Sequence, residues 1–249
     1  MRKIQHALLA VLAVLWAVQP AAAAPSGVPT VTRHTIIKQD PERRMLVKAS
    51  YPSLSMPGAL MGVRGNLEDF NRFVRMKASQ AVVQFIKEVR SFSPPASVPG
   101  QNALAAGYTV ERNTGRLIAV KWTVFRQLVG GAHPDTMVVT LNYDLGGGTI
   151  VLANLFKVGS PYLKIISQQA TAQLKAAAKK SGYKLFGEFL TAKADNFKHF
   201  IVGEKGLDVY FNPGSVAPAV VGIPRVTIPW KAFGASLAPN TGWMRQAFR

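Results

Sequence analysis

The clearest pattern in the chain is an amphipathic helix, which we predict between Asn66 and Arg90. Asn66 is a suitable N-cap, and Glu68 and Asp69 follow in the first turn, where the helix dipole favours negative charge. Apolar side chains recur along this stretch at helical spacing, which predicts one buried face: Leu67, Phe70, Val74, Ala78, Ala81, Val82, Phe85, Ile86 and Val89.

Alternating apolar and polar positions predict strands on both sides of this helix. The expected ranges are 35–38, 46–54, 104–112, 116–128, 136–145 and 149–152. The pair Tyr51-Pro52 indicates an edge strand or a strand end, because proline has no N–H for a neighbouring strand. The stretch Asn113-Thr114-Gly115 is a hairpin turn signal. The strands after the first helix are therefore expected to form an antiparallel meander.

A second helix is predicted to open at Ser160-Pro161 and to run to about Lys180. Gly182 suits the left-handed residue that ends many helices. A shorter helix is expected at residues 184–193. The chain then returns to strands near residues 197–203, 207–211 and 225–229.

A helix followed by a sheet thus occurs loosely twice along the chain. This order predicts an α+β fold in which antiparallel sheets are each packed by a helix, in two similar sub-regions. The expected divisions are a flexible lead at 24–34, an N-terminal α+β subdomain at 35–110, a C-terminal α+β domain at 111–235 and a tail at 236–249.

The first residues predict a cleavable signal peptide at 1–23. Arg2 and Lys3 precede an apolar run from Ala7 to Val18, and small residues around Ala23 suit a signal peptidase. The alternative is a membrane anchor, but the run is shorter than the ~20 residues that span a bilayer. We expect a soluble periplasmic or secreted protein with no transmembrane segment in its mature form.

Charge points to the class of partner. Removing Arg2 and Lys3 with the signal peptide lowers the net charge from +18 to +16. Such a surface attracts polyanions, and export favours an anionic envelope polymer or glycan over nucleic acid. Basic residues gather around the second helix, and Trp230 adds an aromatic beside Lys231; the candidate binding lysines are Lys175, Lys179, Lys180 and Lys184. The alternatives are solvated helix faces and a charge that keeps the protein soluble in an acidic medium.

Candidate chemistry is sparse. The chain contains no cysteine, which excludes disulfides and thiolate metal sites, and it has no HExxH, G-x-S-x-G or phosphate-loop motif. His133 lies in a glycine-rich turn beside Asp135, with Asp144 one strand later, and these groups could bind a metal or perform acid/base work. The alternative is that His133 only shapes the turn. We predict no catalytic residues, no metal and no cofactor.

Short motifs in the second half resemble a known family. They are Gly130-Gly131-Ala132-His133-Pro134, Leu141-Asn142-Tyr143-Asp144, Leu152-Ala153-Asn154-Leu155-Phe156, Gly206-Leu207, Tyr210-Phe211, Val216-Ala217-Pro218, Gly222 and Val226-Thr227-Ile228-Pro229-Trp230. Together they resemble the RsiV-like extracytoplasmic domain, a domain of unknown function in RsiV-type anti-sigma factors and PdaC-type peptidoglycan deacetylases. The stretch from Tyr51 through the first helix resembles the small domain that usually precedes it.

This resemblance implies a non-catalytic α+β module of the cell envelope. In the anti-sigma factors the domain senses lysozyme, and in the deacetylases it accompanies cell-wall chemistry. Ser215 and Ala219 stand where the family usually has tyrosines. We therefore expect a binding or accessory protein for an anionic polymer or a peptidoglycan-type glycan. The alternatives are a lysozyme-binding sensor or inhibitor, and an envelope-polymer hydrolase centred on His133.

Overall fold

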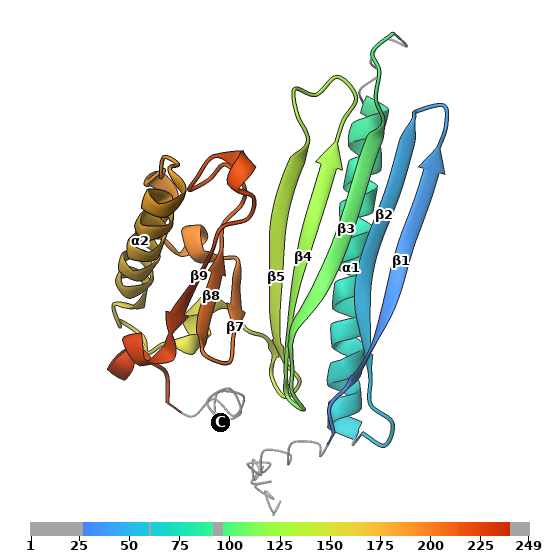
Figure 1. Ribbon diagram of the computed structural model, residues 1–249. Coiled ribbons are helices and arrows are strands. Elements are labelled where there is room, and N and C mark those ends of the chain that lie inside the picture. The colour runs from blue at the N-terminus through green and yellow to red at the C-terminus, as the bar shows by residue number, and fades with distance from the viewer. Residues whose placement is uncertain (1–26, 60, 92–96, 240–249) are drawn as a thin grey trace, which may run out of the picture.

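The computed structural model describes residues 27–59, 61–91 and 97–239, and these form two bodies that each contain a sheet and a helix (Figure 1). The larger body is a six-stranded sheet covered by α1 (Met61–Ser91), and the smaller is a three-stranded sheet covered by α2 (Tyr162–Ser181). The α+β fold class is therefore confirmed. The predicted signal peptide and most of the predicted tail lie outside the described residues. In the described ranges, no helix combines the length and apolar character needed to cross a membrane.

The six-stranded sheet is mixed: antiparallel sheets were expected, and one of its strand pairs is parallel. Its strands follow chain order: β1 (Thr30–Asp40), β2 (Met45–Ser55), β3 (Asn102–Asn113), β4 (Leu117–Gln127), β5 (Asp135–Asp144) and β6 (Gly148–Thr149). Residues 45–49 of β2 pair in parallel with residues 102–106 of β3. The cause is α1, which carries the chain back along the sheet between these two strands, as a crossover connection does.

The ends of these strands differ from the predicted divisions. Residues 30–34, expected in a flexible lead, belong to β1, because Thr30 pairs with Ser55 and the ladder continues without a break. The expected boundary between residues 110 and 111 falls inside β3. Pro52 lies in an interior strand. It follows the last β2 residue that pairs with β3, so its missing N–H removes no hydrogen bond between β2 and β3.

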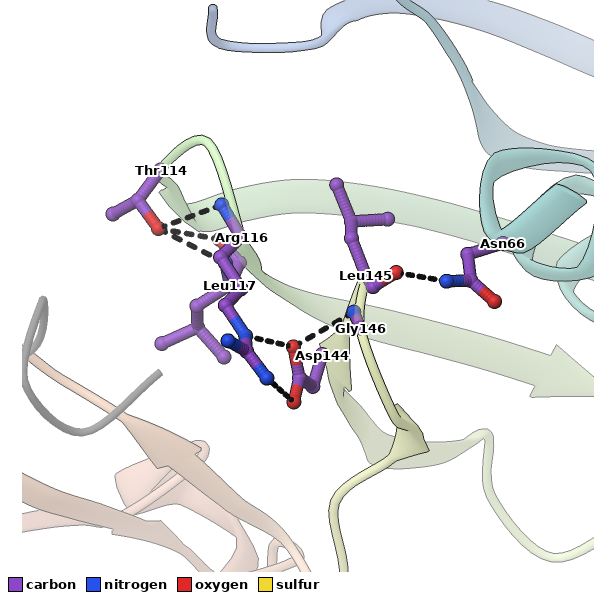
Figure 2. Close-up of polar contacts among 7 residues, drawn as sticks. All are labelled: Asn66, Thr114, Arg116, Leu117, Asp144, Leu145 and Gly146. Carbon is purple, nitrogen blue, oxygen red and sulfur yellow. Dashed lines mark hydrogen bonds and ion pairs between the residues drawn. The ribbon is translucent and has the colours of Figure 1, made fainter. Parts of the chain in front are cut away.

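Helix α1 begins at Met61, earlier than the predicted cap at Asn66. Asn66 lies inside the helix, where its Nδ2 donates a hydrogen bond to the carbonyl of Leu145 (Figure 2). Val63, in the added turn, is buried against the sheet. The helix is therefore about one turn longer than its capping residues indicate, because the added turn packs against the sheet. Its buried side chains match the predicted stripe at Leu67, Phe70, Val74, Val82, Phe85 and Val89.

The smaller body contains an antiparallel sheet of β7 (Phe200–Val202), β8 (Gly206–Tyr210) and β9 (Arg225–Pro229). Helix α2 buries Ile166, Ala170, Leu174 and Ala178 and ends at Gly182, whose φ of 72° is the predicted left-handed stop. The expected helix at 184–193 is wrong. That segment holds only a 3₁₀ turn at Glu188–Leu190, because the N–H of Phe186 bonds to the carbonyl of Val216 instead of to its own segment.

The two bodies meet across the two sheets. Ala119 and Val138, on the face of the larger sheet opposite α1, pack against Ile201 and Tyr210 of the smaller one. The packing therefore runs from α1 through both sheets to α2. Asn142 stabilises this contact through two hydrogen bonds. Its buried side-chain amide donates to the carbonyl of Phe200 and accepts from the N–H of Val202, both at 2.8 Å.

Candidate functional site

The structure does not assemble a centre from His133, Asp135 and Asp144. His133 is exposed in the loop before β5, with Nδ1 3.1 Å from the carbonyl oxygen of Pro134. Asp135 begins β5 and Asp144 ends it. At ~3.4 Å per residue, the two carboxylates lie roughly 30 Å apart. Among the described residues, no group of three His, Cys, Asp or Glu side chains could hold a metal ion.

Asp144 instead belongs to a structural clamp at the end of the larger sheet (Figure 2). Its Oδ1 accepts a hydrogen bond of 2.7 Å from Arg116 Nε, and its Oδ2 accepts one of 3.1 Å from Arg116 Nη2. Oδ1 also accepts from the N–H of Gly146 at 2.9 Å. These hydrogen bonds raise the pKa of the Arg116 guanidinium above its usual value. The clamp joins the turn between β3 and β4 to the turn between β5 and β6.

The clamp explains the glycine-rich turn after β5. A Cβ added at Gly146 would lie 2.9 Å from Arg116 Nη2, closer than real side chains approach. A Cβ added at Gly147 would lie 3.1 Å from Asp144 Oδ2. Gly148 has a φ of 88°, which a side chain disfavours. These glycines therefore allow the chain to turn tightly around the Arg116–Asp144 ion pair.

Trp230 is buried in the core of the smaller body rather than exposed. Its Nε1 donates to the carbonyl of Gly203 at 3.2 Å, and its ring lies 6.1 Å from that of Phe233. It therefore does not supply the exposed aromatic platform that its position beside Lys231 indicated.

The four predicted lysines are exposed along the second half of α2 and just after it, and we call them the α2 lysine cluster: Lys175, Lys179, Lys180 and Lys184. All four side chains are exposed, the first three on α2 and the last just after Gly182. Lys179 and Lys180 lie in the last helical turn, where the helix dipole favours cations. In the part of the chain that the structure describes, no ion pair involves any of the four.

Sequence reasoning missed two features of the charged residues. Lys164 is exposed about three turns before Lys175 and so lies on the same side of α2, a relation that helical spacing already contains. The second feature is a charged group around Tyr210 at the contact between the sheets. The Nζ of Lys121 lies 5.0 Å from the Tyr210 ring centroid, and the Cζ of Arg225 lies 5.7 Å from it.

The charges around Tyr210 are paired. Glu111 bonds Lys121 at 2.7 Å, and Asp208 accepts from Arg225 at 2.9 Å. Burial raises the pKa of Tyr210 to about 12, with a further contribution from Glu111. The phenol therefore stays neutral, and its ring face is available to both cations. This group links β3 and β4 to β8 and β9, so its role is to hold the two bodies together.

The segment that carries the α2 lysine cluster matches a described family. The model of "Protein of unknown function (DUF3298)" matches residues 153–231, which include α2 and the three-stranded sheet. The chain contains a DUF3298 domain. The resemblance drawn from the sequence is thereby confirmed, and all four lysines of the cluster lie in the DUF3298 domain.

A curated relative extends the similarity beyond this domain. The chain is 25% identical over 163 residues to "Peptidoglycan-N-acetylmuramic acid deacetylase PdaC" of Bacillus subtilis (strain 168). The match covers 65% of this chain and 34% of PdaC, so the chain spans about a third of the length of that enzyme. The shared region thus includes residues outside the DUF3298 domain.

Two crystal structures of DUF3298 family proteins share the fold over most of the chain. The protein from Bacteroides fragilis NCTC 9343 has a TM-score of 0.55 and 16% identity, covering 85% of this chain and 94% of its own. The protein from Pseudomonas aeruginosa PAO1 has a TM-score of 0.53 and 14% identity, covering 85% and 93%. The pairing of a helix-covered larger sheet with a DUF3298 domain therefore recurs in other proteins.

Proposed function

We propose that this chain is a non-catalytic binding module of the cell envelope, which holds an anionic glycan polymer through the α2 lysine cluster of its DUF3298 domain. The observation that carries the proposal is the exposure of Lys175, Lys179, Lys180 and Lys184 without carboxylate partners among the described residues. Exposed cations along one helix and its exit offer a polyanion several contacts at once. The net charge, +18 for the full chain and +16 without Arg2 and Lys3, adds a long-range attraction.

The similarity to PdaC supports an envelope polymer as the partner. The name of that enzyme places its reaction on peptidoglycan, a polymer whose peptide stems carry carboxylates. Lysine ammonium groups are flexible point charges, which suits a polymer that presents carboxylates at irregular spacing. The hydrolase alternative has less support, because His133 and Asp144 lie at opposite ends of β5.

The test replaces all four lysines of the cluster by glutamine and measures binding to purified peptidoglycan and to lipopolysaccharide by sedimentation. A matched control replaces the same number of exposed lysines elsewhere, at Lys38, Lys48, Lys87 and Lys205. Exposed ion pairs are individually weak, and four together predict a loss of about tenfold in affinity. The control should lose much less, because it lowers only the net charge.

A salt series separates the mechanisms. Exposed charges are screened over ~8 Å at physiological ionic strength, so polymer binding should weaken with salt, and less steeply in the cluster variant. Equal losses in both variants would show that net charge, and not this surface, is responsible. A parallel assay measures the binding of both variants to a basic lysozyme. Tight, salt-insensitive lysozyme binding that the cluster variant retains would replace our proposal with the lysozyme-binding alternative.

A further inference from the structure

The core beneath α1 contains a gap. The buried residues of the helix form one group up to Val74 and a second from Val82 onward. Between them, α1 presents Ala78 and Ala81, and the facing strands present Ala49 and Ala106. Four short side chains meeting across the layer leave a cavity of about 330 Å³ between α1 and the larger sheet. Protein interiors are normally close-packed, with few voids larger than a water molecule.

The walls of this cavity are apolar. Two of its polar groups have partners within the protein: Trp122 Nε1 donates to the carbonyl of Ser50 at 3.2 Å, and the Ser50 hydroxyl pairs with that of Thr35 at 3.0 Å. A space with such walls holds water poorly and favours hydrocarbon. Its volume lies at the lower end of the ~300–1,000 Å³ typical of small-molecule sites.

The mouth carries one charge. Lys77 is the only charged residue among those that line the cavity, and its side chain is exposed. Its Nζ lies 5.6 Å from the centroid of the Phe73 ring, which also lines the cavity. No ion pair within the described ranges involves Lys77. Val139, on strand β5, also lines the cavity and is 42% exposed, so the cavity is open to solvent there as well.

We propose that this cavity binds the hydrocarbon chain of an anionic amphiphile, with the Lys77 ammonium paired to the head group at the mouth. An apolar interior with a cation at its entrance is complementary to a long-chain carboxylate. The site lies in the larger body, outside the DUF3298 domain, and is independent of the α2 lysine cluster. A free fatty acid and a single-chain anionic phospholipid share this chemistry.

The experiment uses dansylundecanoate, whose fluorescence increases in an apolar site, and measures its displacement by dodecanoate, dodecanol or lysophosphatidylglycerol. The wild-type chain should bind the probe and should prefer dodecanoate to dodecanol. Lys77→Met should abolish most of that preference while dodecanol binding persists. Comparing dodecanoate with lysophosphatidylglycerol distinguishes the two sources of the ligand.

Cavity filling provides the decisive comparison. Ala106→Leu fills the space, whereas Ala105→Leu makes the same change on the opposite face of β3, where the side chain is exposed. Ala106→Leu should weaken probe binding at least tenfold, and Ala105→Leu should leave it unchanged. Ala78→Leu, from the helix side, serves as a second filling variant if Ala106→Leu does not fold. Absent probe binding in the wild type, or binding that folded filling variants retain, would overturn the proposal.

Discussion

Replacing Arg116 by methionine should destabilise the larger sheet without changing any residue of the α2 lysine cluster. The change removes both hydrogen bonds that the guanidinium donates to Asp144 and leaves that carboxylate with the N–H of Gly146 (Figure 2). The side chain of Asp144 is only 8% exposed, so water cannot replace the lost partner fully. The turns before β4 and before β6 lose their mutual restraint.

The size of the effect follows from the exposure of the two partners. Removing one member of a fully buried ion pair costs about 3–5 kcal/mol, whereas exposed pairs contribute about 0–1 kcal/mol. Arg116 is 25% exposed, which places this pair between the two limits. We expect the free energy of unfolding to fall by about 2–3 kcal/mol.

Urea denaturation followed by circular dichroism measures this loss. Arg126→Met is the control, because its pair with Glu88 also spans 2.7 Å but is more exposed, at 35% and 29%. It should cost under about 1 kcal/mol. Adding Asp144→Asn to Arg116→Met should restore part of the stability by removing the unpaired charge. If Arg116→Met costs no more than Arg126→Met, the clamp does not stabilise the fold as we argue.

Two further predictions concern the contact between the bodies and the response to pH. Asn142→Ala should lower the free energy of unfolding by about 2–4 kcal/mol, because the carbonyl of Phe200 and the N–H of Val202 stay buried without a partner; an unchanged melting temperature would contradict this. Burial, followed by Lys198, lowers the pKa of His199, so the unfolded chain binds a proton below about pH 6.5 that the folded chain does not. Stability should therefore decrease as the pH falls from 7 to 5, and His199→Gln should remove that part of the decrease in urea titrations at both pH values.

Local chemistry made several elements predictable. The expected strand at 225–229 coincides with β9, and the turn at Asn113-Thr114-Gly115 joins β3 to β4 as expected. Gly182 ends α2 in the left-handed conformation that glycine adopts without strain. In each case the decisive residues are neighbours in the sequence, so their pattern alone contains the information.

Elements that depend on distant residues were predicted less well. The parallel pairing of β2 with β3 brings together residues 45–49 and 102–106, and nothing local to either segment specifies its partner. The same holds for Asp144, which looked available for chemistry beside His133 but is held by Arg116. The position of Trp230 beside Lys231 indicated a binding residue, whereas its ring is buried beside Phe233.

The α+β class, the family resemblance and the exposed lysines of α2 follow from the chain's local pattern, because hydrophobic periodicity separates the buried face of a helix from its solvated face. The contact through Asn142 and the cavity beneath α1 depend on how distant segments come together in three dimensions. Asn142 matters because its amide meets β7 of the other body. The cavity exists because alanines from α1, β2 and β3 face one another across a layer, and the space between side chains depends on which of them meet.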